Sequence, residues 1–506
     1  MSKTPGEPVA VAGGPHASQK PLRVGVAALF AANSLSFVVV AVSYVLYSRL
    51  LSPGVFGLYA IASTIGALGV TVLDGGMKNT VIKAPRELTD VEEGTLTFVM
   101  TGGALVLLAL MIAADRPVIH WFPAAGRDYR FLALFGALYL MSWPFMVLQT
   151  AHLERKLDYA RVAWIESGGL ILERGLPAVL LLFTRQGIYS FAWGLAAGRL
   201  FRVTSLNVRH LQPVRIPSIA EIRSLLPLAA EGAWLQASTA FCMVRDNLHV
   251  LLVGPLFGTV WVGYYAWGLQ LSVMASQVFV QMSARVSLPL FASARSSEDR
   301  WRTCLYQVRW LAVVIGPILA MLLLVVPTVD GRFFGGRWSA AVALLPLLFT
   351  RMLASLAATP LAPLLMVERG SRSYAQANIV WTVVEGTVSA VALVMVGPSG
   401  LAWTYAVVGW FGLWLYLAPP GYRTDRWPVR RLGALMSALL LRPGLVVALT
   451  ALVAVAVYMR SPFTVFPNHL GLMAGATAVL AASYLAEGDV RRLLTALSTR
   501  ANPGTR

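Results

Sequence analysis

The chain of 506 residues is poor in charge, in cysteine and in histidine. Only 13% of its residues are charged, against roughly 25% in a soluble globular domain. Its two cysteines, Cys242 and Cys304, are too few for a disulfide framework. Its six histidines show no His-Glu-x-x-His spacing. These shortages exclude an ordinary soluble domain, a disulfide-rich fold and a metalloprotease-like metal site.

Acidic residues are scarce compared with basic ones, with 23 Asp and Glu against 41 Lys and Arg. The net charge of +18 would suit a nucleic-acid partner, but the basic residues are dispersed in short loops and form no basic domain. We therefore expect no nucleic acid. No Gly-x4-Gly-Lys-Ser/Thr motif is present, so we expect no ATP hydrolysis by this chain. No cofactor is predicted, and coupling to a proton or sodium gradient stays open.

Long apolar segments are what the chain does have, because 57% of its residues are hydrophobic. Runs of 18 or more apolar residues recur, and each can cross the ~30 Å hydrocarbon core as a helix. The first run follows a polar tail and is too long for a signal-peptide core. Fourteen spans are predicted, at about 24–48, 55–77, 95–114, 130–151, 160–183, 187–207, 226–254, 260–291, 306–328, 338–366, 374–396, 399–418, 443–459 and 466–486.

The distribution of basic residues predicts the orientation. With fourteen spans, the segments on the side of the termini contain or adjoin 29 Lys and Arg, and the opposite loops contain or adjoin 8. Short cytoplasmic loops carry the excess of positive charge in membrane proteins. Both termini are therefore predicted to be cytoplasmic.

Short sequence motifs occur twice, a little over 200 residues apart. Residues 153–155, Leu-Glu-Arg, are echoed by Val-Glu-Arg at 367–369, and Phe-Gly-Leu-Tyr at 56–59 is echoed by Val-Gly-Tyr-Tyr at 262–265. The two copies of the second motif lie at the starts of spans two and eight. Because these spans are six crossings apart, an even number, both run in the same direction across the membrane. Such duplication is typical of transporters built from parallel repeats, related by an axis along the membrane normal.

The predicted fold is an all-α polytopic membrane protein with about 14 transmembrane helices, forming two parallel six-helix repeats plus two C-terminal helices. Its divisions are a cytoplasmic tail at 1–22, an N-terminal half at 23–210, a linker at 211–225, a C-terminal half at 226–418, a cytoplasmic loop at 419–442, two extra helices at 443–486 and a cytoplasmic tail at 487–506.

Four arginines lie inside predicted spans: Arg174, Arg245, Arg285 and Arg351. A charge at the centre of a bilayer costs at least ~2.5–3.5 kcal/mol on insertion scales, so such groups face a cavity or a partner. A cationic cavity suits a diphosphate, because guanidinium binds phosphate oxygens through a planar fork. The alternatives are structural. Arg174 can pair across to a neighbouring helix, and Arg285 can snorkel to the cytoplasmic surface.

Three further residues are candidates for ion coupling: Asp74, Asp246 and His249. Asp74 and Lys78 are four residues apart, so an ion pair between them is the structural alternative. A histidine in a helix is more often a hydrogen-bonded residue than a proton relay, which is the alternative for His249.

Several segments together resemble the bacterial polysaccharide (Wzx-type) flippases of the multidrug/oligosaccharidyl-lipid/polysaccharide exporter superfamily. Residues 49–59, Arg-Leu-Leu-Ser-Pro-Gly-Val-Phe-Gly-Leu-Tyr, are similar to the first-loop signature of that family. Residues 153–159 resemble its cytoplasmic turn after helix four, and 74–77, 285–289 and 334–338 match other family positions. The resemblance covers about residues 25–418. One departure is His249, which stands where the family tends to have Asp, while Asp246 lies three residues earlier.

The resemblance implies a flippase that moves polyprenyl-diphosphate-linked oligosaccharide across the bacterial cytoplasmic (inner) membrane, for lipopolysaccharide O-antigen, capsule or exopolysaccharide. Spans seven and ten flank the central cavity in such proteins, so Arg245 and Arg351 are expected to face it and hold the phosphates. The expected partners are the lipid-linked glycan and membrane lipids, with a polysaccharide polymerase and chain-length machinery as further candidates.

Three other functions stay open. A cation-coupled multidrug exporter of the same superfamily would favour acidic and aromatic cavity groups over arginines. A membrane polysaccharide ligase or glycosyltransferase usually needs a sizeable extramembrane loop with paired carboxylates or His. The longest opposite-side loop, at 115–129, offers Asp115, His120 and Asp128 but little room. A purely structural membrane subunit would not need buried charges.

Overall fold

The computed structural model describes residues 19–441 apart from 79–80, 82–87, 114–128, 157, 185, 209–215, 295 and 419–426. Every regular element in that part of the chain is a helix, so the predicted all-α fold is confirmed. By length and composition, six of its helices can cross a membrane, or seven if one bent pair is a single span. The predicted helices at 443–459 and 466–486, and nearly all of the 115–129 loop, lie outside the described residues.

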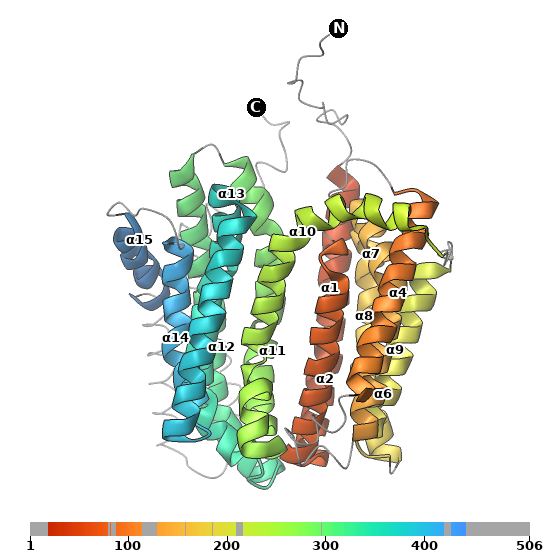
Figure 1. Cartoon of the computed structure of the whole chain (residues 1–506). Helices are drawn as coiled ribbons and strands as arrows, with labels where there is room; N and C mark the ends of the chain where they lie inside the picture. Colours follow the sequence, from red (N-terminus) through yellow and green to blue (C-terminus); the bar gives the residue numbers. More distant parts are fainter. Residues whose placement is uncertain are drawn as a thin grey trace.

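The N-terminal half forms one lobe of the molecule, coloured red to yellow in Figure 1. The break between two of its helices has a local cause, because Pro144 cannot donate to the preceding turn and bends the predicted fourth span by 41°. The helices are α1 (Gln19–Leu50), α2 (Pro53–Asp74), α4 (Asp90–Ala113), α6 (Tyr129–Ser142), α7 (Pro144–Arg155), α8 (Tyr159–Phe183) and α9 (Tyr189–Asn207).

The C-terminal half forms the second lobe, coloured green to blue in Figure 1. Its elements are α10 (Ile219–Asp246), the π-helical turn η2 (His249–Val253), α11 (Gly254–Ser293), α12 (Ser297–Phe333), α13 (Ser339–Val396), α14 (Gly400–Leu417), α15 (Trp427–Met436) and η3 (Ser437–Leu441). Helix α10 begins before the predicted span at 226, because Ser218 and Glu221 form a reciprocal capping box at its start. Its first part lies along the upper end of the bundle (Figure 1).

Helix α13 is 58 residues long but is not one span. At Gly370 the backbone leaves helical geometry with φ of 83°, a conformation that glycine adopts at little cost because it has no Cβ. The two helical segments on either side correspond to predicted spans ten and eleven. All of the first twelve predicted spans therefore fall on described helical segments.

The backbones of the two halves approach each other closely at the duplicated glycines. A Cβ atom at Gly57 of α2 would lie 1.8 Å from the carbonyl oxygen of Thr259 on α11. A Cβ atom at Gly263 of α11 would lie 1.9 Å from the carbonyl oxygen of Pro53 on α2. Two copies related by a two-fold axis contact each other in this reciprocal way. The contact explains why both copies of the motif have glycine.

Candidate functional site: a cavity between the two halves

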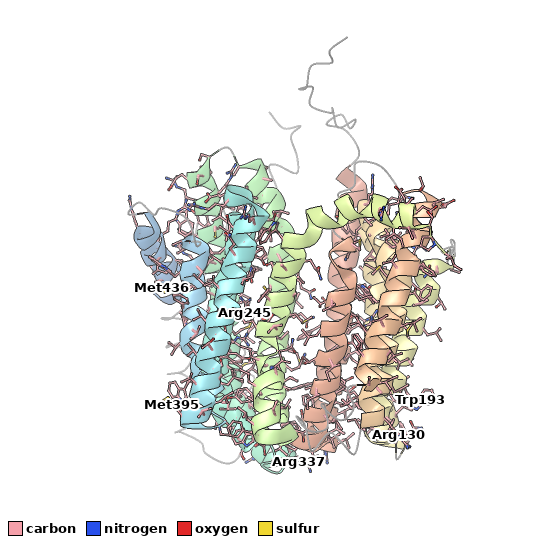
Figure 2. All side chains as sticks on the ribbon, viewed as in Figure 1. Arg130, Trp193, Arg245, Arg337, Met395 and Met436 are labelled. Carbon is pink, nitrogen blue, oxygen red and sulfur yellow. The ribbon has the colours of Figure 1, made fainter. Side chains whose placement is uncertain are left out.

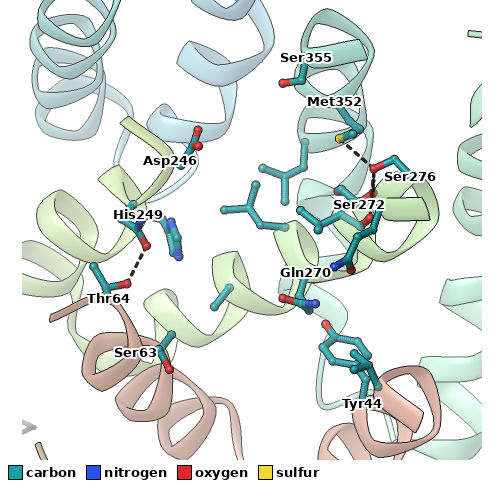
Figure 3. Close-up of a pocket in the computed structure, with 18 of the residues that line it drawn as sticks. Tyr44, Ser63, Thr64, Asp246, His249, Gln270, Ser272, Ser276, Met352 and Ser355 are labelled. Atoms are coloured by element: carbon teal, nitrogen blue, oxygen red, sulfur yellow. Dashed lines mark hydrogen bonds between the residues drawn. The ribbon is translucent and has the colours of Figure 1, made fainter. Parts of the chain in front are cut away.

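A cavity of about 600 Å³ lies between the halves. Its walls come from α1, α2 and α8 of the N-terminal half, and from α10, η2, α11 and α13 of the C-terminal half. Figure 3 shows residues of both halves around this space, with Ser63 and Thr64 on one side and Gln270, Ser272 and Ser276 on another. The site thus requires both halves.

An aromatic layer closes the halves together below the cavity. The ring of Trp267 stacks on that of Trp338 with centroids 5.1 Å apart, and both indole rings bind α1. Trp267 Nε1 donates to Ser48 Oγ and Trp338 Nε1 donates to the Ser48 carbonyl, each at 2.8 Å. The hydroxyl of Tyr44, which lines the cavity, donates to the Trp267 carbonyl. Side chains near the end of α1 therefore tie the two halves at one end of the cavity.

Arg337 strengthens the same closure from the C-terminal half. Its Nη1 donates to the carbonyls of Arg49 and Leu51, both at 3.1 Å. Figure 2 places Arg337 at the lower end of the bundle, as it does Arg130. In the topology predicted from basic residues this end faces outside. The conformation described here therefore has its halves closed at the predicted outer end.

Arg174 is the arginine that the N-terminal half contributes to the cavity lining. Its Nη1 donates to the Tyr59 hydroxyl, and its carbonyl accepts from the Tyr47 hydroxyl. Tyr59 is held in turn by stacking on Phe191, with centroids 4.2 Å apart. The guanidinium is thus fixed by the Tyr59 hydroxyl on α2, while the Tyr47 hydroxyl holds the Arg174 backbone. The partner on another helix that the sequence suggested as an alternative is therefore a tyrosine.

Arg351 is the arginine that the C-terminal half contributes. Its Nη2 lies 3.1 Å from Asp246 Oδ1, which belongs to a cavity-lining side chain that is 62% exposed. The same nitrogen lies 3.6 Å from Glu385 Oε1, whose side chain is 1% exposed. The guanidinium carbon lies 3.8 Å from the ring centroid of Tyr405. Arg351 therefore connects the cavity with a buried carboxyl group behind it.

Arg245 is not among the cavity-lining residues, in contrast to what the family resemblance of span seven implied. Its Nη1 donates to Asn378 Oδ1 at 3.2 Å, and its guanidinium carbon lies 3.9 Å from the Trp381 ring centroid. Asn378 is held by Ser238 at 3.0 Å and by the Tyr416 hydroxyl at 2.9 Å. Arg245 lies inside the C-terminal half (Figure 2), where it joins α10 to α13.

The other candidate residues divide in the same way. Asp246 and His249 line the cavity, and buried His249 contributes an Nδ1 that has no hydrogen-bond partner among the described residues. Asp74 lies at the end of α2, away from the cavity lining, where Oδ2 accepts from the Gly76 N–H at 3.2 Å. The alternative of an Asp74–Lys78 ion pair is not what the structure shows, because Lys78 Nζ lies 2.8 Å from Glu154 Oε1. The Arg285 side chain lies outside the described residues.

Three glutamines and several serines of the cavity lining were not singled out from the sequence. Gln270, Gln277 and Gln281 of α11 follow a helical spacing of seven and four, and all three line the cavity. Ser272 and Ser276 join them on the same helix. A row of amide side chains along one face of an apolar helix can be recognised in the sequence from its spacing. The residues predicted to bind substrate or couple to ions were all charged or titratable.

A smaller pocket of about 260 Å³ adjoins the cavity between α1, α8, α9 and α11. The two share Gln277, Gln281 and Val40 in their walls. In this side pocket Arg202 Nη1 lies 2.7 Å from Glu173 Oε2, and Arg202 Nε lies 3.2 Å from Glu166 Oε2. The side pocket therefore adds ion-paired side chains, hydroxyl groups and amide groups to the polar surface of the main cavity.

The comparisons with known proteins agree with this architecture. Residues 46–343 match the family model described as polysaccharide biosynthesis protein. The lipopolysaccharide biosynthesis protein WzxC of Escherichia coli is 24% identical over 336 residues, which is 63% of this chain and 65% of WzxC. The teichuronic acid biosynthesis protein TuaB of Bacillus subtilis is 23% identical over 288 residues, which is 55% of this chain and 57% of TuaB. The chain thus spans somewhat less than two thirds of the length of each.

The fold is shared with a solved structure. The lipid II flippase MurJ in an inward closed conformation superposes with a TM-score of 0.68 at 14% identity, over 91% of this chain and 99% of MurJ. At that identity the likeness concerns the fold. The family match covers more than half of the chain and includes the first-loop motif, the duplicated glycines and most of the cavity walls. The chain belongs to the polysaccharide biosynthesis protein family, which confirms the resemblance carried by its sequence motifs.

Proposed function

We propose that this protein is a flippase that moves polyprenyl-diphosphate-linked oligosaccharide units across the bacterial cytoplasmic membrane for the synthesis of a surface polysaccharide. The observation that carries the proposal is the cavity between the halves, which receives one arginine from each half. A site built from two repeats can pass a ligand from one side to the other when the repeats rock against each other.

Arg174 and Arg351 are the proposed phosphate ligands. A diphosphate has oxygens enough for two guanidinium groups, and charge-assisted hydrogen bonds to phosphate are stronger than neutral ones. Both arginines are already aligned by hydrogen bonds or ion pairs, Arg174 by Tyr59 and Arg351 by Asp246. Asp246 therefore occupies, at Arg351, the position that a phosphate oxygen would take.

The amide and hydroxyl groups of the cavity are suited to the sugars. Gln270, Gln277 and Gln281 offer both donors and acceptors, which sugar hydroxyl groups require. Tyr44 and Tyr47 add ring faces and hydroxyl groups at the closed end. The polyprenyl tail would stay in the lipid, because no apolar chain of that length needs to leave the bilayer.

The proposed cycle begins from the closed outer end. The cavity admits the diphosphate and sugars from the cytoplasmic side, with both termini in the cytoplasm as the basic residues predict. The aromatic layer of Trp267 and Trp338 would then separate, and the halves would close at the other end. This proposal includes the glycan class but leaves the repeat unit open among O-antigen, capsule and exopolysaccharide.

The test is the export of surface polysaccharide by cells that carry only a variant gene. Arg351→Gln and Arg174→Gln should each reduce export strongly at matched membrane abundance, because each removes a charge and a fork. The matched control is Arg302→Gln, since Arg302 is 69% exposed on α12. Full export by both cavity variants would contradict the proposal. Efflux of organic cations by the purified protein would favour a multidrug exporter instead, and glycan transfer would favour a ligase.

A further inference from the structure

Glu385 is a buried carboxyl group that the proposed phosphate site does not use. It lies in the second helical segment of α13 and its residue exposure is 0%. Neither of its carboxylate oxygens accepts a hydrogen bond of ordinary geometry from any described residue. Its nearest cation, Arg351 Nη2, lies 3.6 Å from Oε1, beyond hydrogen-bond distance. Buried polar groups nearly always have hydrogen-bond partners, and a buried carboxylate that lacks them is neutralised more easily than one that is fully hydrogen-bonded.

Other polar groups that lack an ordinary hydrogen bond continue along the same helix face. Trp381 Nε1 and Ser389 Oγ lie four residues before and after Glu385, and neither makes a hydrogen bond of ordinary geometry in the described part of the chain. The Trp381 indole is nevertheless close enough to interact with the Glu385 carboxyl group. Side chains spaced by four residues lie one above the other on a helix. The buried hydroxyl of Tyr405 on α14 likewise makes no such hydrogen bond among the described residues. Buried polar groups that lack protein partners are the groups to which buried water commonly binds.

Arg351 links this buried row to the cavity. One nitrogen, Nη2, lies 3.6 Å from Glu385 Oε1 and 3.1 Å from Asp246 Oδ1. Glu385 is enclosed in the protein, whereas Asp246 is solvated in the cavity. Whatever takes Arg351 away from the carboxylates therefore affects the two differently, because water can compensate Asp246 but not Glu385.

The remaining charged and titratable groups near Glu385 come from three elements. Arg245 and Asp246 of α10 act on its carboxyl group together with Arg351. Tyr405 faces it from α14, and His249 of η2 faces Arg351. Two guanidinium groups thus accompany two carboxylates. An anion that binds Arg351 adds negative charge to these two arginines and two carboxylates. The charge of Glu385 is the one that water cannot stabilise, because Glu385 is buried.

We propose that Glu385 is a proton-binding site linked to anion binding at Arg351. When the phosphate of the substrate takes Arg351, the Glu385 carboxylate accepts one proton from cavity water and becomes a neutral carboxylic acid. When the anion leaves, the proton returns to water and Arg351 pairs with Glu385 again. Arg351 keeps its own proton throughout. A sodium ion fits the place less well, since it would be repelled by the adjacent Arg351. The inference rests on the proposed function for the identity of its anion.

The first measurement does not require substrate. Infrared difference spectra of the purified full-length protein, recorded between high and low pH, should contain the carbonyl band of a buried carboxylic acid. Glu385→Gln should abolish that band, and Glu385→Asp, which keeps a carboxyl group, should shift it. The matched control is Glu298→Gln, because Glu298 is an exposed carboxylate on α12. Identical band patterns in wild type, Glu385→Gln and Glu385→Asp would overturn the proton site.

The second measurement tests the linkage with inorganic pyrophosphate as the probe. Calorimetric titrations in buffers of different ionisation enthalpy count the protons taken up on binding. Wild type should take up about one proton more per pyrophosphate than Glu385→Gln, a linkage that corresponds to an affinity change of up to ~10-fold per pH unit. The difference between the two proteins cancels the titration of the probe itself.

The variant Asp246→Asn distinguishes the role of Asp246 from that of Glu385. It removes the solvated competitor for Arg351, so it should tighten pyrophosphate binding while the extra proton uptake persists. Equal proton uptake by wild type and Glu385→Gln would overturn the linkage. A carboxylic acid band that depends on Glu385, together with no pyrophosphate binding by wild type, would overturn the anion site of the proposed function and leave the proton site standing.

Discussion

Two arginines of the C-terminal half, Arg351 on α13 and Arg245 on α10, have different roles in this molecule because of the direction in which each side chain leaves its helix. Arg351 reaches the cavity, where it meets Asp246 at 3.1 Å. Arg245 reaches Asn378 at 3.2 Å and stacks on Trp381 inside the C-terminal half. One is placed to exchange its partner for a ligand. The other has its partners on the adjacent helix and holds two elements together.

Arg245→Gln should therefore reduce stability more than it reduces substrate affinity. Gln keeps a hydrogen-bonding group for Asn378 but loses the stacked plane over Trp381 and the charge, and a cation–π contact in a desolvated place contributes about 2 kcal/mol. The measurement is the thermal midpoint of the purified variant beside its affinity for pyrophosphate. A variant with normal stability and lost affinity would make Arg245 a ligand-binding residue after all.

Gly57→Ala should destabilise the contact between the halves. The new Cβ atom would lie 1.8 Å from the Thr259 carbonyl oxygen, so α2 and α11 must separate. Overpacking of this kind costs about 1–3 kcal/mol. Gly102→Ala on α4 is the matched control, because its Cβ would meet nothing within 4 Å. Equal thermal midpoints for the two variants would show that the close approach at Gly57 is not required.

The sequence predicted which residues carry charge inside the bilayer but not where these charges point. A residue advances 100° around a helix, so the adjacent Arg245 and Asp246 serve different places: Arg245 reaches Asn378 and Asp246 lines the cavity, although Arg245 Nε and Asp246 Oδ1 remain 4.0 Å apart. The rotation of a helix about its axis is set by packing against its neighbours, here by residues such as Asn378 from 133 positions away. Composition contains no such information. The amide stripe on α11, in contrast, has a period and was readable.

At the scale of the helix, the spans were predictable because their signal is local. Hydropathy over about 20 residues defines a span, and the first twelve predicted spans fall on helical segments. Ends were less predictable, as α10 shows. Its first residues lie at the upper end of the bundle (Figure 1) and begin at a capping box, which is polar and gives no hydropathy signal.

The closed end should open when its tryptophan hydrogen bonds are removed. Trp338→Phe loses the donor to the Ser48 carbonyl and Trp338→Ala also loses the stacked ring on Trp267. Both variants should shift the population toward the state open to the outside, Trp338→Ala more strongly. The matched control is Trp403→Ala on α14, since Trp403 is 56% exposed.

The readout for this shift is chemical labelling from outside the cell. Ser63 lines the cavity and becomes the single reporter, Ser63→Cys, once Cys242 and Cys304 are replaced by alanine. A membrane-impermeant maleimide should react several-fold faster with the reporter when Trp338→Ala is present. Unchanged labelling would mean that the aromatic layer does not hold the outer end closed.

At the scale of the whole molecule, the two copies of the Glu-Arg motif share one feature. The glutamate of each Glu-Arg pair binds a cation near the end of its segment, Glu154 with Lys78 at 2.8 Å and Glu368 with Arg431 at 3.4 Å. We predict that residues 25–210 and 226–418 superpose after a rotation of about 180° around the membrane normal. Superposition of the two halves checks this. A better fit about an axis in the membrane plane would contradict parallel repeats.

The orientation of the molecule is a separate prediction. Reporter fusions after residues 155 and 300 should lie in the cytoplasm, and a fusion after residue 337 should lie outside, because basic residues concentrate on the side of the termini. A reporter after residue 337 that is found in the cytoplasm would show that the orientation is the reverse of the predicted one. The closed end of the cavity would then face inward.

The glycine contact between α2 and α11 has a mechanical consequence. Packed helices usually have a preferred crossing angle because side-chain ridges of one fit the grooves of the other. At Gly57 and Gly263 backbone meets backbone, and no ridge is present to interlock. We therefore expect the two lobes to tilt about this contact, because a change of crossing angle between α2 and α11 meets no interlocked side chains at the two glycines.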